Sequence, residues 1–277
     1  MEPKFIAGLV VFGTFPLFYL LELVTGRLTR SRVPLKNFFF TIAGFSSQAI
    51  ISGALLGSLL GFITSTFFLN SADILSNVPF LVAFLVLFFT NEFMHYWVHR
   101  KAHEWRWLWK IHRTHHSAED LNIGVLYRYN IFWVILLPHT WTGAFAVHFG
   151  LGGPFMLAVL ITYFINASTH TSYRWDLYLR NKFPSFIPAW KVIEKYITLP
   201  DTHHAHHAFG DSAHPNGNYA VSVFFFDVLY GTAKIPNARQ EYFGLPISSR
   251  LPWKEEIFWP ILRQDLLPKL NEKIIES

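Results

Sequence analysis

Eight histidines lie in three close groups along the chain, and their spacing is typical of metal ligands. His99 and His103 are four residues apart. On an α-helix that spacing returns a side chain to within about 40° of its starting direction, so both imidazoles can share an ion. The other two groups use the i, i+3, i+4 spacing, which presents three imidazoles from about one helical turn. They are His112, His115 and His116, then His203, His206 and His207.

The number of imidazoles predicts more than one ion. A mononuclear site rarely uses more than three or four protein ligands, so eight grouped histidines favour two ions. Histidine clusters can also bind metals adventitiously at a surface. Here each group lies near the end of an apolar segment. We therefore predict a dinuclear centre, and nitrogen ligands suit iron, copper or zinc.

The composition places these groups in a membrane protein. Of 277 residues, 52% are hydrophobic, 18% are aromatic and only 15% are charged; the mean hydropathy is +0.28. That is too apolar for an ordinary soluble domain. A spanning helix needs about 20 apolar residues, and the apolar runs cover residues 5–24, 38–69, 78–98, 131–150 and 154–167. We expect an all-α polytopic membrane protein with four to five transmembrane helices and a cytoplasmic helical cap that carries the histidine-rich dimetal site.

Basic residues predict the orientation of these helices. Lys and Arg favour the cytoplasmic side of short loops. They occur in the loop after the first run and around the first two histidine groups, whereas residues 70–77 and 150–154 have none. Alternating the five runs then puts all three histidine groups, and the tail from Ser168, on the cytoplasmic face, in a bacterial inner membrane or the endoplasmic reticulum. Residues 5–24 lack a small-residue cleavage site, so we interpret them as a retained anchor.

The second apolar run is too long for one upright span. About 32 residues at 1.5 Å each exceed a 30 Å core, so a tilted helix or a bent pair is expected, and a full hairpin is disfavoured because it would place Arg100 outside. Gly53, Gly57 and Gly61 recur in it at every fourth residue. This spacing lets another helix approach closely. We expect packing inside one protomer rather than a dimer interface.

The chain must turn between the first two histidine groups. In one straight helix His112 would lie about 20 Å beyond His99 and on the opposite face. Residues 104–110 are rich in tryptophan and basic residues, which suit a turn at the membrane interface. Ligand imidazoles are neutral and their second nitrogens need hydrogen-bond acceptors. The carboxylates near the groups are candidates for that role: Glu104, Glu119, Asp120, Asp201 and Asp227.

The absence of cysteine narrows the chemistry. There is none in the sequence, which excludes disulfides, iron–sulfur clusters and a thiolate-bound haem. Zinc in imidazole ligands could hydrolyse a substrate and iron could activate dioxygen. A metal reached by an apolar chain meets many C–H bonds but few hydrolysable ones, so oxidation is favoured.

The histidine segments resemble those of the fatty acid hydroxylase and sterol desaturase superfamily, the membrane non-haem diiron oxygenases. The likeness covers roughly residues 90–235, with features of the alkylglycerol monooxygenase-like and bacterial desaturase-like branch. It is carried by residues 96–103 (YWVHRKAH), 112–117 (HRTHHS) and 203–207 (HHAHH), and by 119–122 (EDLN), 218–220 (NYA) and 226–232 (FDVLYGT).

The resemblance implies a ligand set and a reaction. The family places a histidine after the last span, and His170 occupies that position as a ninth metal ligand; Asn166, one turn earlier, is a weaker candidate at the site. Two iron ions would use dioxygen to hydroxylate or desaturate a C–H bond of a membrane lipid, such as a fatty acyl or alkyl chain or a sterol. Zinc could replace iron in recombinant protein. No catalytic residue beyond the metal ligands is expected.

Electrons must come from a partner. The sequence has no dinucleotide-binding glycine pattern after a strand, and no fused haem domain is expected. A ferredoxin, a cytochrome b5 or a reductase is implied, and no nucleic acid partner. The alternative function is a membrane metal-binding or metal-transport protein. We expect a single membrane domain, with anchoring segments in 1–89, the histidine region in 90–235 and an interfacial tail in 236–277.

Overall fold

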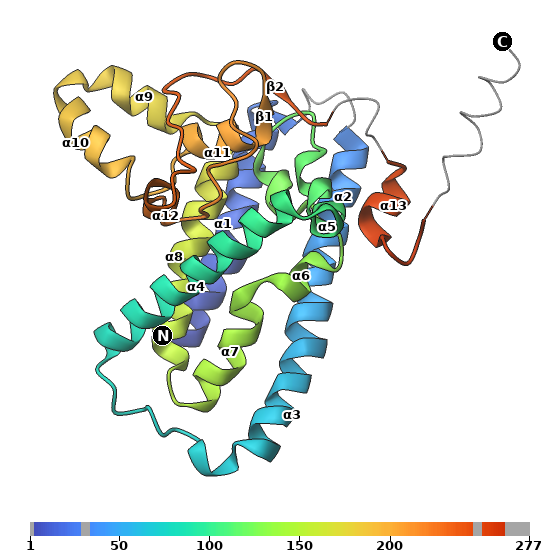
Figure 1. Cartoon of the computed structure of the whole chain (residues 1–277), viewed down its shortest axis with the longest axis vertical. Helices are drawn as coiled ribbons and strands as arrows, with labels where there is room; N and C mark the ends of the chain where they lie inside the picture. Colours follow the sequence, from blue (N-terminus) through green and yellow to red (C-terminus); the bar gives the residue numbers. More distant parts are fainter. Residues whose placement is uncertain (1–2, 29–33, 246–250, 264–277) are drawn as a thin grey trace, which may run out of the picture.

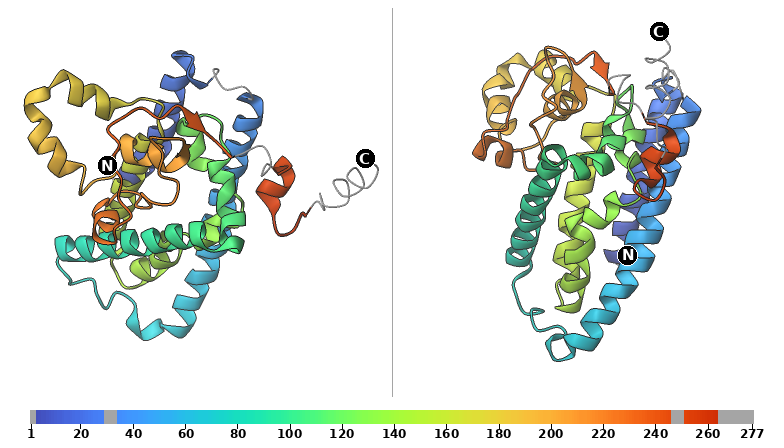
Figure 2. Two further views of the ribbon diagram at one scale, coloured as in Figure 1. Left: turned by 45° about the horizontal axis from the view of Figure 1, so that its top comes forward. Right: turned by 45° about the vertical axis from the view of Figure 1, so that its right-hand side comes forward.

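The computed structural model describes residues 3–28, 34–245 and 251–263, and most of them are helical. Long helices form a bundle that narrows toward one end, and short helices and loops cover the other end (Figure 1). We call these the narrow end and the capped end. The second view in Figure 2 shows the long helices side by side between the two ends.

The first helices run to and from the capped end. Helix α1 (Pro3–Val24) ends there. The next helix descends as α2 (Pro34–Ser47), a π-helical stretch η2 (Gln48–Leu56) and α3 (Gly57–Phe67). It is unbroken over 33 residues, Leu35–Phe67. One long helix is therefore correct for the second apolar run, and a hairpin is excluded.

The turn predicted between the first two histidine groups is confirmed. Helix α4 (Phe80–Glu104) rises from the narrow end, and α5 (Arg106–His116) follows across the capped end. Trp105 between them is extended, with φ −99° and ψ 120°. This single residue redirects the chain, so α5 folds back and His112 comes beside His99.

The fourth apolar run is not a spanning helix, contrary to our expectation. It forms α6 (Trp133–Leu136) and α7 (Pro138–His148), separated by an extended Leu137. Pro138 has no N–H to continue a helical ladder, which explains the break. Eleven residues reach about 16 Å, roughly half of a bilayer core. Helix α8 (Gly152–His170) then rises beside α4 to the capped end.

The remaining elements build the cap. They are α9 (Trp175–Lys182), the 3₁₀ turn η5 (Pro184–Phe186), α10 (Ile187–Ile193), α11 (Pro200–His207), α12 (Phe225–Leu229) and α13 (Trp253–Phe258). Strands β1 (Ala208–Phe209) and β2 (Tyr242–Phe243) pair antiparallel, with Ala208 opposite Phe243. A 3₁₀ segment, η4 (Ile123–Tyr127), follows α5 and packs on α2.

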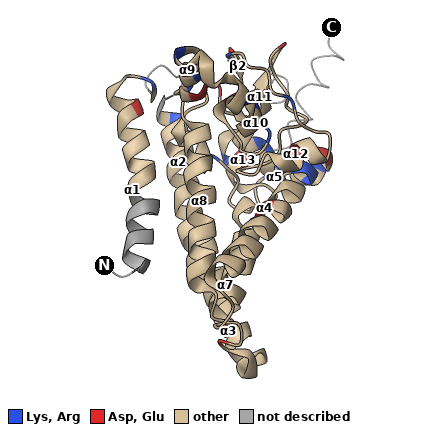
Figure 3. Ribbon diagram, turned by 90° about the vertical axis from the view of Figure 1, so that its left-hand side faces the viewer, with Lys and Arg blue, Asp and Glu red and all other residues tan. Residues whose placement is uncertain are grey.

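Three helices in the described residues are long and apolar enough to cross a membrane. They are Leu35–Phe67, Phe80–Glu104 and Gly152–His170, and Gly13–Val24 is a shorter apolar helix. Figure 3 shows charged residues gathered at the capped end, whereas the long helices below it are uncharged along most of their length. The chain is therefore a helical membrane protein with most of its charged residues at one end. The cytoplasmic side and the division at residues 89 and 235 remain predictions.

The glycines that recur every fourth residue in the second apolar run do not pack against another helix in the described part of the chain. Gly53, Gly57 and Gly61 are exposed, and a methyl group added at Gly61 would have no neighbour within 4 Å. Packing inside one protomer is therefore wrong for this stripe.

In the tail, α13 packs on α5, and Glu256 and Ile257 are buried. Helix α13 is thus docked against the protein, and the interfacial position of the tail stays a prediction; residues 246–250 and 264–277 lie outside the described residues.

Candidate metal centre

The fold brings all nine predicted histidine ligands together at the capped end. They form two groups, and within each group one nitrogen from every ring lies within 4.8 Å of the others. The five-histidine group is His99, His103, His112, His116 and His206; the four-histidine group is His115, His170, His203 and His207. The rings of His116 and His207 stack at 4.4 Å between centroids, so the groups are adjacent.

The second and third sequence motifs are each divided between the two groups, whereas His99 and His103 of the first motif lie together in the five-histidine group. Along α5, His115 points into one group while His112 and His116 point into the other. Helix α11 divides in the same way, because His206 is one residue from His207 but about 100° around the helix. Each helix therefore supplies ligands to both groups and fixes the distance between them.

Backbone carbonyls orient the rings in both groups. In the five-histidine group, Nδ1 of His99 donates to the carbonyl of Tyr219 at 2.6 Å, and Nδ1 of His206 donates to that of Gly217 at 2.7 Å. A carbonyl only accepts, so both Nδ1 atoms carry the proton and both Nε2 atoms keep a lone pair. These two Nε2 atoms lie 3.0 Å apart.

The four-histidine group repeats this arrangement. Nδ1 of His115 donates to the carbonyl of Arg128 at 3.3 Å, and Nδ1 of His170 to that of Asn166 at 2.7 Å. Their Nε2 atoms face each other at 3.3 Å. Two facing lone pairs repel unless a cation lies between them. Each group has such a pair, so the residues present fit two metal ions.

Burial also keeps the histidine rings of the cap in the neutral form that a metal ligand requires. Desolvation lowers the pKa values of the cap histidines well below the usual range, so these rings are neutral at physiological pH. They are His112, His115, His116, His203, His206 and His207. Among the described residues, buried Nε2 atoms of His103 and His207 have no hydrogen-bond partner. A metal ion would satisfy them.

The predicted carboxylate acceptors are wrong where the structure shows the contact. Glu104 pairs with Arg100 and Lys101 on the surface of α4. Asp227 accepts from the backbone N–H groups of Tyr219 and Ala220 and from the hydroxyl of Thr232. It therefore holds the loop whose carbonyls orient His99 and His206, one step away from the rings. The roles of Glu119 and Asp120 remain predictions.

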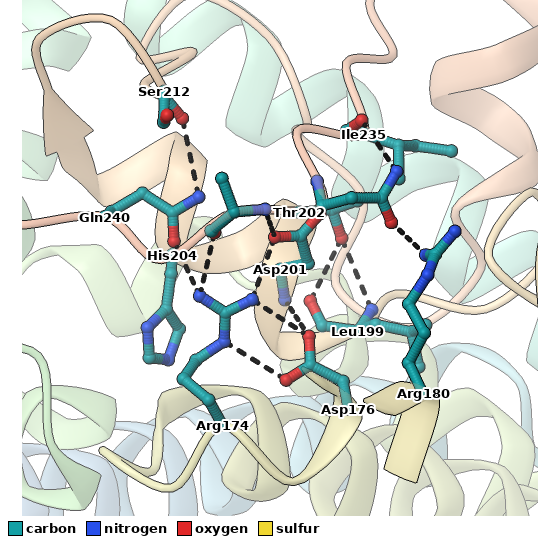
Figure 4. Close-up of polar contacts among 12 residues, drawn as sticks. Arg174, Asp176, Arg180, Leu199, Asp201, Thr202, His204, Ser212, Ile235 and Gln240 are labelled. Carbon is teal, nitrogen blue, oxygen red and sulfur yellow. Dashed lines mark hydrogen bonds and ion pairs between the residues drawn. The ribbon is translucent and has the colours of Figure 1, made fainter. Parts of the chain in front are cut away.

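Asp201 also acts at a distance from the ligands. It lies in the first turn of α11 and accepts from Arg174 at 2.8 Å (Figure 4). It also accepts from the backbone N–H of Asn237 at 2.6 Å. Asp176 pairs with the same guanidinium at 3.1 Å and accepts from the backbone N–H of Asp201 at 2.7 Å. This buried network anchors the start of the helix that carries the third histidine group.

A cavity of about 300 Å³ adjoins both metal groups. His99 and His112 of the five-histidine group line it, as do His115, His170 and His203 of the other. The opposite walls come from α4, α7 and α8, so the cavity extends from the capped end into the bundle. Asn166 lines it too, although its role toward a metal remains a prediction. Sequence reasoning missed the aromatic walls Tyr127, Tyr129 and Trp133, because their apolar surroundings resemble an ordinary core.

The fatty acid hydroxylase family model matches residues 84–232, which is more than half of the chain and contains all nine histidines. The chain therefore belongs to the fatty acid hydroxylase family.

Among curated proteins, it is similar to alkylglycerol monooxygenases. It is 27% identical to the Xenopus tropicalis enzyme over 60% of this chain, and 28% identical to the Homo sapiens enzyme over 59%. These matches cover 34% and 33% of the relatives, so the chain spans about a third of their length. No solved structure matches it.

Proposed function

We propose that this protein is a dinuclear iron monooxygenase that hydroxylates a C–H bond of a neutral membrane lipid. The observation that supports this proposal is that each histidine group contains two Nε2 lone pairs that face each other. Both groups lie beside a cavity that extends into the bundle. All-nitrogen ligands suit iron, and the family is one of lipid hydroxylases by its description. The relatives' name favours an alkylglycerol, a glyceryl ether lipid, as the substrate class.

The reaction balances with an external reductant. A C–H bond, one dioxygen, two electrons and two protons give an alcohol and water. The iron pair supplies the oxidising chemistry when bound. The protein holds the neutral imidazoles in place through the carbonyls of Gly217, Tyr219, Arg128 and Asn166, and the cavity walls limit water and position the chain of the lipid.

A ferredoxin, a cytochrome b5 or a reductase would deliver the electrons at the capped end, which we place on the cytoplasmic face. Arg106 and Lys110 on α5 give that end basic residues. A basic surface attracts acidic redox partners.

The alternative, a metal transporter, fits the geometry less well. Transporters place their sites near the bilayer midplane on broken helices. Here the ligands occupy helix ends: His99 and His103 lie in the last turns of α4, and His170 is the last residue of α8.

Metal stoichiometry and lipid mass test the proposal together. Protein from iron-grown cells should contain about two irons per chain, and lipids of the expressing cells should include species heavier by 16 mass units. His115→Ala and His206→Ala each remove a ligand from one group, so both should lose iron and the new lipid species. A change of −2 would indicate desaturation. One metal or none, with unchanged lipids, would favour the transporter.

A further inference from the structure

Two further histidines face the cavity without belonging to either metal group. His95 lies on α4 one turn before His99, and His139 lies in the first turn of α7. The ring centroid of His95 is 6.4 Å from that of His99, so it stands one ring away from the five-histidine group. Both line the wall formed by the membrane-embedded helices rather than the cap.

Two other polar side chains on this wall, Asn91 and Gln48, have partners within the protein. The amide of Asn91 accepts from Thr142 at 2.7 Å and donates to the carbonyl of Leu87 at 2.8 Å. The amide oxygen of Gln48 accepts from Tyr129 at 3.4 Å. In the described part of the chain, by contrast, the rings of His95 and His139 make no hydrogen bond. Each ring therefore lines the cavity with an N–H that is free to donate to a ligand.

A polar group without a partner away from water is costly, so a cavity that presents two free imidazoles favours an occupant with a polar atom. A plain hydrocarbon would leave both rings unsatisfied. A neutral imidazole carries one N–H, and an ether oxygen has two lone pairs and no hydrogen. Two imidazole donors and one ether oxygen are therefore complementary.

We propose that His95 and His139 bind the ether oxygen of the lipid substrate, an inference that rests on the proposed function and adds the residues that hold this oxygen. An oxygen bound by His95 would lie close to His99 of the five-histidine group, because the two rings are neighbours. A carbon within a few bonds of that oxygen would then face the metal site. These residues would then select ether lipids over hydrocarbon chains and set which carbon reacts.

Binding to the zinc-loaded protein tests this separately from turnover. The probes are radiolabelled 1-O-hexadecylglycerol and its carba analogue, in which a methylene replaces the ether oxygen. Wild-type protein in lipid nanodiscs should bind the ether about tenfold more tightly, the value of one hydrogen bond. His95→Phe and His139→Phe keep an aromatic ring but remove the donor, so each should reduce that preference, and the double variant should abolish it.

Two further variants control the experiment. His148 is on the same helix as His139 but contacts the carbonyl of Phe68 outside the cavity, so His148→Phe should keep the preference. His139→Gln restores an N–H donor and should recover part of it. Zinc content should stay at wild-type levels in the His95 and His139 variants.

Several results would overturn the inference. They are equal binding of the two probes by the wild type, an unchanged preference in the double variant, or loss of one zinc per chain from it, which would make the pair a third metal site. If binding follows our expectation while the iron-loaded protein oxidises no lipid, the proposed function fails and the binding site stands. If oxidation occurs without the preference, the inference alone fails.

Discussion

At the scale of residues, the centre depends on which face of a helix each histidine occupies. His203 and His204 are neighbours in one motif, yet only His203 enters a metal group, with its Nε2 3.0 Å from that of His170. His204 instead contacts the carbonyl of Thr171 at 3.0 Å. A run of histidines thus contains both ligand positions and a structural position.

This division predicts different outcomes for two adjacent substitutions. His203→Ala should lose about one metal per chain, because it removes a ligand from the four-histidine group. His204→Ala should keep both metals and lose about 1 kcal/mol of stability, the usual value of one hydrogen bond. Metal analysis and thermal unfolding of the purified variants measure both effects. Equal metal loss in the two variants would contradict the assignment of His204.

Asp227 predicts a pH dependence. Burial raises the pKa of its carboxyl from 3.8 to about 6, against the opposing effect of its hydrogen bonds. The folded protein thus holds this proton more tightly than the unfolded chain. The stabilisation that protonated Asp227 gives the folded state is fully present below about pH 4. It decreases by about 3 kcal/mol as the pH rises through about 6.

The Asp227→Asn variant removes that ionisation. Its melting temperature should therefore fall less than that of the wild type between pH 4 and pH 6.5, whatever other groups titrate in both proteins. Parallel melting curves across this range would show that Asp227 does not titrate there.

At the scale of elements, close contacts between helices and loops shape the cavity. Gly44 on α2 lies against the backbone of Tyr127, and a Cβ atom there would overlap its carbonyl oxygen. Tyr127 lines the cavity and its hydroxyl lies 3.4 Å from that of Tyr163 on α8. The glycine therefore lets α2 and η4 approach closely enough to form one wall of the cavity.

Two glycine substitutions on the same long helix should have opposite effects. Gly44→Ala should cost about 1–3 kcal/mol or more, because the backbone of Tyr127 must move. Gly61→Ala, which meets no atom within 4 Å, should be neutral or stabilise the helix by up to about 1 kcal/mol. Melting temperatures in detergent compare them. A strongly destabilising Gly61→Ala would instead reveal a contact made by that exposed face.

At the scale of the whole molecule, polar and apolar residues separate along the bundle. The metal groups and most of the charged residues lie at the capped end, and the narrow end consists of the connections 68–79 and 149–151. A bilayer would accept the uncharged long helices and leave the cap in water. Such a protein positions a buried metal centre at the capped end, above a cavity that extends into the bundle.

The natural lack of cysteine makes the orientation testable by single labels. Asn77 at the narrow end and Asn216 at the capped end are both exposed. With the cap in the cytoplasm, Asn77→Cys should react with a membrane-impermeant maleimide in intact bacterial spheroplasts. Asn216→Cys should react only after permeabilisation. The reverse pattern would place the cap outside and exclude a cytoplasmic electron donor.

The sequence by itself determined the long apolar helices, a turn within residues 104–110 and the gathering of the eight grouped histidines in one site. These follow from local properties: hydropathy over a span, helical spacing and a helix too long to return without a break. His170 was expected only from the resemblance to the family. The broken fourth run was missed because hydropathy averages over Pro138 and does not detect the interruption.

Only the tertiary structure decided how the histidines divide between two groups and which atoms orient them. His99 meets His206, and His115 meets His170, across long separations in the chain. Their acceptors are the carbonyls of Tyr219, Gly217, Arg128 and Asn166. Every residue carries the same carbonyl, so no side-chain pattern marks those that will face a ligand. Their positions follow from packing of the whole chain.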